Sequence, residues 1–385
     1  MAAILIESAL SLPERITSVS RRPASLGQVP PGAISLAMGE PDGDTSAPVV
    51  EAAVRSLRAG RTHYAPLTGS NELREALARW VTSTSGRPTT VAEIVPTHGA
   101  AAGLASIMLG LVGPGDRVIV PEPTYSLYAD HLAMAGAERI WVPNRADGCL
   151  DLDRIESLAP EARMVVLCNP SNPTGGVLST AELTRLADIV ERNPQLLLVA
   201  DEAYGDIVYD GVAFESALAL ERIREQTVVV GTFSKSFAMT GWRLGYIVAV
   251  PELAGKISLV HRTINGSLNT FVQDAAIEAL KTPPSYFEEM RERYQRRRDL
   301  VVAALDDIDR VSVKRPAGAF YAFPRVDSDL SSAELVDAFA RGGVLVRAGS
   351  EFGPSGEGYV RISFATDEQS LAEGLRRFGD VVEKL

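Results

Sequence analysis

The residue with the clearest chemical potential is Lys235, which closely follows the apolar run of residues 227–230 in the segment TFSKSFAMTGWRLGY. A buried strand over that run would deliver the lysine into a cleft. Burial or neighbouring cations would suppress its charge there, leaving an amine that can form a Schiff base with an aldehyde. Most lysines are exposed surface charges, but Thr232, Ser234 and Arg243 stand nearby as groups suited to binding phosphate. The segment therefore predicts covalent amine chemistry beside an anion site.

Further polar residues follow other apolar runs. Asp201 comes directly after LLLVA, and a carboxylate at the carboxyl end of a parallel strand points into the crevice where α/β folds bind ligands. The alternative is a helix N-cap, because Asp is favoured there and Tyr204 could begin a helix. Tyr204 one turn along and Asn172 at another strand end favour the ligand site. Arg361 lies in the alternating segment YVRISFA, where an inward-facing charge needs an anion.

The elements that must position these residues alternate through the middle of the chain. Short β-rich runs separated by helical segments indicate a mostly parallel sheet sandwiched by helices. Pro48 opens one helix that Gly60 closes, and Ser179 or Thr180 caps another that ends before Pro194. The seven expected strands cover residues 94–97, 118–120, 139–142, 164–167, 196–200, 227–230 and 244–249.

The pattern changes after Pro283 and Pro284. A long charged helix is followed by two strand-like runs, residues 344–347 and 359–364, and by an amphipathic helix from Asp367. This stretch predicts a second, smaller α/β unit. A chain of 385 residues is long enough for two domains.

Composition excludes several classes of protein. The net charge is −11, from 38 basic and 49 acidic residues, and the charges are scattered, so nucleic acid is not expected as a partner. Cys149 and Cys168 are expected to be reduced and structural. The four histidines lack the close pairing of a metal site, so no metal is expected. No signal peptide or membrane span is expected, which favours a cytoplasmic location without membrane partners.

Taken in order and spacing, the lysine segment, NPSNPTGG, VADEAY and YVRISFA resemble the class I aminotransferases, which are pyridoxal 5'-phosphate (PLP) enzymes of fold type I. The resemblance covers nearly the whole chain. It implies an α/β PLP-transferase fold with a mostly parallel seven-stranded sheet in a large domain of residues 46–285. Residues 15–45 and 286–385 would form the small domain, and residues 1–14 an arm that reaches a partner subunit.

The same resemblance implies a role for each candidate residue. Lys235 would carry PLP covalently, Asp201 would pair with the pyridine nitrogen, and Tyr204 and Asn172 would hydrogen-bond the phenolic oxygen. Tyr125 would stack on the ring, although core packing is the commoner fate of a lone tyrosine.

For the phosphate, the resemblance implies the backbone amides of THGAAAGL at a helix N-terminus. Tyr64 would reach the phosphate of the neighbouring subunit, making an obligate homodimer with shared sites. Gly39, Asn172 and Arg361 would bind the substrate, with Arg361 and the backbone of Gly39 holding its carboxylate. The full set around the phosphate would be Gly99, Ala100, Ala101, Thr232, Ser234, Arg243 and Tyr64.

The expected activity is transfer of an amino group from an L-amino acid to a 2-oxo acid, in a ping-pong cycle through pyridoxamine phosphate. Aspartate-specific members commonly place a lysine and a tryptophan where Ala101 and Tyr125 stand, so an uncharged, aromatic or specialised amino acid is as plausible as a dicarboxylic one. β-Lyases, cyclising synthases and decarboxylases share the fold and the lysine and remain open. An inactive ligand-sensing module ranks last, because no room for a basic DNA-binding domain precedes Gly39.

Overall fold

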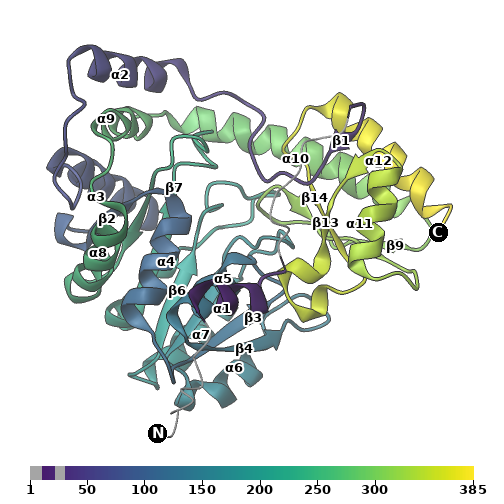
Figure 1. Ribbon diagram of the computed structural model, residues 1–385, viewed down its shortest axis with the longest axis horizontal. Helices are drawn as coiled ribbons and strands as arrows, with labels where there is room; N and C mark the ends of the chain where they lie inside the picture. Colours follow the sequence, from purple (N-terminus) through teal and green to yellow (C-terminus); the bar gives the residue numbers. More distant parts are fainter. Residues whose placement is uncertain (1–10, 22–30) are drawn as a thin grey trace, which may run out of the picture.

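The computed structural model describes residues 11–21 and 31–385 (Figure 1). Residues 1–10 of the expected arm lie outside this part of the chain. Among the described residues, none of the helices has both the length and the apolar character needed to cross a membrane.

A seven-stranded mixed sheet forms the centre of the molecule, in the order β2-β8-β7-β6-β5-β3-β4. Only β8 runs antiparallel to its neighbours, β2 and β7, while the remaining pairs are parallel. The expected α/β class and the seven expected strands are therefore confirmed. The strands are β2 (Ile94–Thr97), β3 (Arg117–Glu122), β4 (Glu138–Pro143), β5 (Met164–Cys168), β6 (Leu197–Asp201), β7 (Thr227–Thr232) and β8 (Gly245–Val248).

Alternate side chains of the parallel strands face two separate layers of helices, because successive residues of a strand point to opposite faces. Val118, Val166 and Val228 pack with one layer, whereas Ile119 and Val165 belong to the core on the other face. The first layer contains α4 (Gly99–Leu111), α5 (Leu127–Ala135) and α8 (Pro251–Asn265). The second core includes α2 (Ala47–Arg58), α3 (Asn71–Ser85), α6 (Leu152–Leu158), α7 (Thr180–Glu191) and α9 (Thr270–Ala279).

Smaller sheets lie beside this core. β1 (Ile34–Ser35) pairs in parallel with β12 (Val344–Leu345), and β10 (Tyr321–Ala322), β14 (Val360–Ser363) and β13 (Arg347–Ala348) form an antiparallel sheet. A third pair joins β9 (Val311–Ser312) and β11 (Arg325–Val326). The run expected as a single strand over residues 344–347 is thus two strands that belong to different sheets.

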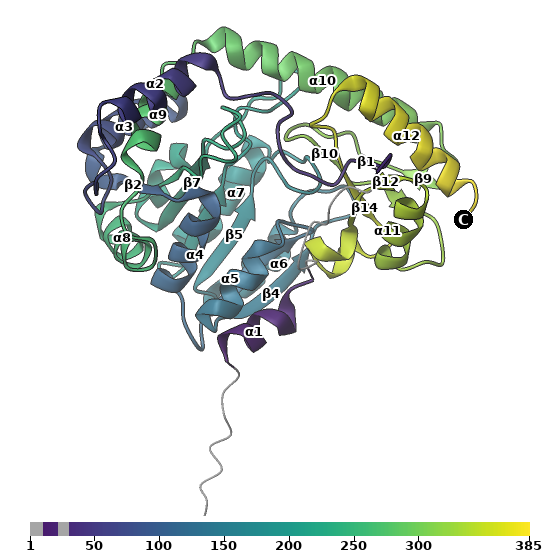
Figure 2. The same cartoon turned by 45° about the horizontal axis from the view of Figure 1, so that its top comes forward.

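The helices of this second region are α10 (Pro284–Asp306), α11 (Ser332–Arg341) and α12 (Glu368–Val382). Figure 2 shows α10 running along the top of the molecule, from the helices beside the large sheet towards α12. Short 3₁₀ turns complete the elements: η1 (Val91–Glu93), η2 (Ala159–Glu161), η3 (Ala217–Ala219), η4 (Glu221–Gln226), η5 (Gly349–Phe352) and η6 (Pro354–Gly356).

The segment expected to join the smaller domain divides between two places. α1 (Leu12–Val19) lies against α5, where Arg15 Nη2 donates to the carbonyl of Met134 at 3.3 Å and Ser20 Oγ donates to Asp130 at 3.3 Å. β1, by contrast, pairs with β12. The domain boundaries inferred from the sequence stay a prediction.

Candidate active site

The carboxyl ends of β5, β6 and β7 open into a pocket of about 290 Å³. Because these strands are parallel, the polar residues that follow them meet at one edge of the sheet. The pocket gathers most of the residues singled out in the sequence: Gly39, Ala100, Ala101, Tyr125, Asn172, Asp201, Tyr204, Thr232, Ser234, Lys235, Arg243 and Arg361. Gly99 lies next to Arg243, whereas Tyr64 is 97% exposed outside the pocket.

Lys235 follows β7, with its ammonium inside the pocket. Its Nζ donates to the carbonyl of Gly39 at 2.6 Å and lies 5.9 Å from the centre of the Tyr204 ring. Burial, followed by the positive charges of Arg361 and Arg243, lowers the pKa of Lys235 to about 8. The amine is therefore neutral and nucleophilic in a much larger fraction of molecules near physiological pH than an ordinary lysine would be.

Asp201 ends β6 and is only 3% exposed. Its carboxylate accepts hydrogen bonds from the Tyr128 hydroxyl at 2.9 Å and from the Ala203 amide at 3.2 Å. Burial raises the pKa of Asp201 to about 6, although the bond from Tyr128 opposes this shift. The residues after it form a turn and no helix, so Asp201 is not a helix N-cap.

Tyr128 and Tyr321 are two site residues that sequence reasoning missed. Tyr128 is fully buried in α5 and orients Asp201, while the hydroxyls of Tyr204 and Tyr321 are 2.8 Å apart. In the sequence both look like core aromatics. Tyr128 follows the expected ring at Tyr125 by three positions in the sequence, and this closeness was the available signal.

Arg361 lies on β14 with its guanidinium directed into the same pocket. Nη1 donates to Asn172 Oδ1 at 3.0 Å and Nη2 donates to the carbonyl of Ala37 at 2.7 Å. The guanidinium also lies over the Tyr321 ring, 4.3 Å from its centre. Its Nε is buried without a hydrogen-bond partner among the described residues. The guanidinium can therefore still bind an anion through this nitrogen.

The opposite end of the pocket suits a phosphate. Thr232 Oγ1 and Ser234 Oγ are 3.0 Å apart, and Arg243 Nη1 donates to the carbonyl of Thr240 at 2.8 Å. α4 begins here at Gly99, whose φ of +75° is left-handed. A Cβ on Gly99 would come within 2.9 Å of Arg243 Nη2, so glycine is what allows the arginine to approach the helix N-terminus.

These groups together fit PLP. A lysine amine, a buried carboxylate, a pair of hydroxyls beside an arginine and a helix N-terminus are the donors and acceptors that its aldehyde, ring nitrogen and phosphate require.

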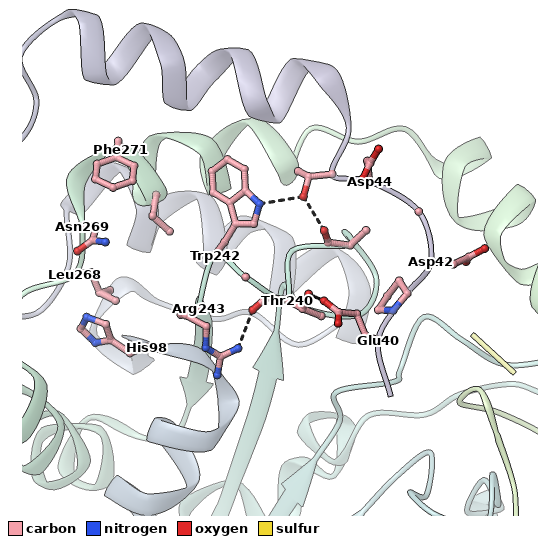
Figure 3. A pocket seen from close by; sticks show the side chains of 16 residues that line it. Glu40, Asp42, Asp44, His98, Thr240, Trp242, Arg243, Leu268, Asn269 and Phe271 are labelled. Atoms are coloured by element: carbon pink, nitrogen blue, oxygen red, sulfur yellow. Dashed lines mark hydrogen bonds between the residues drawn. The ribbon is translucent and has the colours of Figure 1, made fainter. Parts of the chain in front are cut away.

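A larger cavity of about 620 Å³ adjoins the pocket and shares Glu40, Thr240 and Arg243 with it (Figure 3). Trp242 Nε1 donates to Thr45 Oγ1 at 2.9 Å on one side of this cavity. His98, beside the N-terminus of α4, lies on another side.

Comparison with known proteins shows the family to which the chain belongs. A family model described as aminotransferase class I and II matches residues 31–378. The chain is 36% identical over 357 residues to an aspartate aminotransferase of Pyrococcus horikoshii, covering 91% of this chain and 90% of that protein. It is 37% identical over 390 residues to an aromatic-amino-acid aminotransferase of Thermococcus litoralis, covering 97% and 99%. A crystal structure of an aromatic aminotransferase from Pyrococcus horikoshii superposes with a TM-score of 0.90 at 34% identity, covering 97% of this chain and 99% of that one.

The chain belongs to the class I and II aminotransferases. It is an enzyme, a PLP-dependent aminotransferase of fold type I, as the resemblance predicted. Aminotransferases of this kind act on an amino acid and a 2-oxo acid.

Proposed function

We propose that this aminotransferase works at the pocket beside Lys235 in a ping-pong cycle through pyridoxamine phosphate, with L-amino acids of uncharged or aromatic side chain as preferred donors. The observation that supports the site most strongly is the buried Lys235 amine, with its lowered pKa, between Asp201 and Arg361. When bound, PLP supplies an aldehyde that carries the amino group and a ring that draws electrons away from the substrate Cα.

Lys235 is the proposed general base. Its neutral amine takes the proton from the substrate Cα and can return it on the same face of the pocket. With a pKa of about 8, the amine is neutral in about a tenth of the molecules at pH 7, far more than an ordinary lysine would be.

Asp201 is the proposed partner of the pyridine nitrogen. A carboxylate held by Tyr128 and the Ala203 amide is fixed in place, and a protonated nitrogen would return its pKa towards the ordinary range. Tyr204 and Asn172 are proposed to bind the phenolic oxygen, while Tyr321 and Arg361 hold these two side chains in position.

Arg361 is the proposed site for the substrate carboxylate, together with the backbone of Gly39. The contacts to Asn172 and Ala37 orient the guanidinium, and a bidentate bond to a carboxylate would fix the substrate Cα near Lys235.

The phosphate is proposed to lie between the α4 N-terminus and the cation of Arg243. The amides of Gly99, Ala100 and Ala101 and the helix dipole would bind it together with the hydroxyls of Thr232 and Ser234. Tyr125 is the proposed stacking ring; it lines the pocket and makes an edge contact with Tyr128 at 5.6 Å.

The preference for uncharged donors is proposed from the residues that line the pocket. Ala101 stands where a lysine is common in aspartate-specific relatives, and Met38, Tyr125 and Phe352 add apolar surface. The pocket is lined by four cationic side chains, Lys235, Arg243, Arg347 and Arg361. Three of them have other proposed roles, and Arg347 forms an ion pair with Glu351.

We also propose a homodimer with shared sites in the cytoplasm. Exposed apolar side chains gather on α2, the loop after it and α8, which lie on the same side of the molecule in Figure 1: Val50, Leu57, Tyr64, Leu67, Leu259 and Ile264. Such a surface is typical of a subunit interface. The cavity beside Arg243 leaves room for Tyr64 of the partner subunit.

The experiment that tests this function is a single-turnover spectral scan of the PLP-loaded protein against a panel of amino acids, without any oxo acid. We expect the cofactor spectrum to change to that of pyridoxamine phosphate, with the matching 2-oxo acid identified by mass spectrometry. Lys235→Ala serves as the control and should show no conversion while keeping a native circular dichroism spectrum. Elimination, decarboxylation or cyclisation of the amino acid with PLP retained would contradict transamination.

A further inference from the structure

Two arginines lie opposite one another in the wall of the active site. Arg347 on β13 is the register partner of Arg361 on β14, and both line the pocket. Directly opposed residues of an antiparallel pair project from the same face of the sheet, and like charges in such positions destabilise the pair. Arg347 is 8% exposed and Arg361 is 7% exposed, so water screens this repulsion poorly.

Glu351 compensates one of these two charges. Its carboxylate forms an ion pair with Arg347 Nη2, and its side chain is only 8% exposed. Glu351 is also close enough to Arg361 for that guanidinium to lower the pKa of its carboxyl, although burial raises the pKa overall. The two arginines carry two positive charges and the ionised glutamate carries one negative charge, so the three side chains together have a net charge of +1.

The hydrogen bonds of Arg361 show that its guanidinium has no acidic partner among the described residues. Two of its nitrogens bond to neutral oxygens, those of Asn172 and Ala37, and the third has no partner among the described residues. Arg347 instead forms an ion pair with the Glu351 carboxylate. A carboxylate bound to Arg361 would occupy the position that an incoming substrate needs.

We propose that Arg347 is a positioning residue that sequesters Glu351 from Arg361 and so keeps Arg361 available for the substrate carboxylate. The inference rests on the proposed role of Arg361 as the carboxylate site. Without Arg347, Glu351 is left as a buried acid within the electrostatic reach of Arg361, whose Nε has no hydrogen-bond partner among the described residues. It then acts as an internal competitor of every carboxylate substrate, whatever its side chain.

The test compares four variants of the PLP-loaded enzyme: Arg347→Met, the double variant Arg347→Met/Glu351→Gln, Arg361→Met, and Arg341→Met. The last is the matched control, because Arg341 is an exposed arginine of α11, away from the pocket. Steady-state KM and kcat are measured with L-phenylalanine, L-alanine, L-aspartate and 2-oxoglutarate. The dissociation constant of 3-phenylpropanoate, which has no amino group to transfer, is measured by competition.

Loss of Arg347 alone should raise KM about tenfold to a hundredfold for all of these substrates, with a matching rise for 3-phenylpropanoate and kcat changed by less than about threefold. The double variant should restore KM to within about threefold of wild type, since the competing acid is gone. Arg341→Met should behave as wild type. Rescue by the second substitution also shows that the effect of the first is not misfolding.

Two results would overturn the inference while leaving the proposed function intact: Arg361→Met raises KM but Arg347→Met does not, or the double variant is no better than the single one. A third result, in which Arg347→Met affects only L-aspartate and 2-oxoglutarate, would also overturn it. That result would make Arg347 a direct ligand of a distal carboxylate and would contradict the proposed preference for uncharged donors, but not transamination itself. An unchanged KM in Arg361→Met would instead contradict the proposed carboxylate site itself.

Discussion

At the scale of single residues, burial shifts the pKa values of Lys235 and Asp201 in opposite directions. It lowers the first to about 8 and raises the second to about 6, so both groups move towards their neutral forms. Pairs of titratable groups with such opposed shifts are characteristic of acid–base sites. Their mutual attraction reduces both shifts without cancelling them, because desolvation is the larger effect for each.

The lowered pKa of Lys235 can be checked in the protein stripped of PLP. An amine reacts only when neutral, so labelling of Lys235 by trinitrobenzenesulfonate should be half-maximal near pH 8 and level off about one to two pH units above that. Peptide mass spectrometry measures the labelled fraction at each pH. Protection of Lys235 by added PLP is the control. Labelling that keeps rising through pH 10, as for an ordinary lysine, would contradict the shift.

Replacing Asp201 with Ala should separate cofactor binding from turnover. The phosphate and lysine contacts remain, so PLP should still bind and give its bound absorbance. The fixed negative charge for the ring nitrogen is lost, and kcat should fall by at least about a hundredfold. A kcat within about threefold of wild type would show that Asp201 does not serve the ring.

At the scale of elements, the antiparallel β8 explains why Lys235 and Arg243 meet. The segment between β7 and β8 leaves and re-enters the sheet at the same edge, because the two strands run in opposite directions. Gly245 begins β8 beside both Thr232 and Thr97. A Cβ on Gly245 would lie 2.8 Å from the Ala100 amide nitrogen, so this glycine lets the start of α4 close onto the segment.

Gly99→Ala should therefore weaken PLP binding. The left-handed φ costs an alanine about 1–3 kcal/mol, and its Cβ would push the flexible end of Arg243 aside. Release of this strain shifts the α4 amides and Arg243 from the proposed phosphate position, so the dissociation constant of PLP should rise about fivefold to a hundredfold. Equilibrium dialysis of the apoprotein measures it. Gly255→Ala is the matched control, because this helical glycine of α8 has open space around its Cβ position. Equal PLP affinity in both variants would contradict the role of the α4 N-terminus.

The seven strands of the large sheet could be predicted because apolar runs of residues with high strand propensity are a local signal. The division of residues 344–347 into two strands could not be predicted from the sequence. Val344 and Leu345 pair with β1, whereas Arg347 pairs with β14. The partners in β1 lie hundreds of residues away in the chain, and Arg361 lies more than ten residues from Arg347. A local sequence pattern cannot show either pairing. Tyr128 and Tyr321 were missed for the same reason, because their contacts with Asp201 and Tyr204 exist only after folding.

At the scale of the whole molecule, the pocket is assembled from both sets of sheets. Lys235 and Asp201 come from the large sheet, whereas Arg361 and Tyr321 come from the small antiparallel sheet. α10 connects the two regions, and its fully buried Arg298 binds Asp210 through two nitrogens at 2.7 and 2.9 Å. The groups proposed to act in catalysis and to bind the substrate carboxylate are thus held in one frame without being close in sequence.

A shared active site can be tested by mixing Tyr64→Phe subunits with Lys235→Ala subunits. If Tyr64 serves the partner subunit, one site of each heterodimer regains both Lys235 and an intact Tyr64. That site should recover the PLP affinity that Tyr64→Phe homodimers lose. Heterodimers isolated by two different affinity tags are compared with each parent homodimer. Affinity no better than in the Tyr64→Phe homodimer would argue for a site built from one chain.

The buried ionisable groups of the pocket also affect the folding stability of the protein, and so its lifetime in the cell. Without PLP, the buried Asp201 carboxyl and Lys235 amine lack the partners that we propose for them. A ligand that binds only the folded chain stabilises it by about 2.7 kcal/mol at a hundred times its dissociation constant. A cell short of PLP should therefore clear newly made chains faster. The abundance of the enzyme, and not only its activity, should follow the supply of PLP.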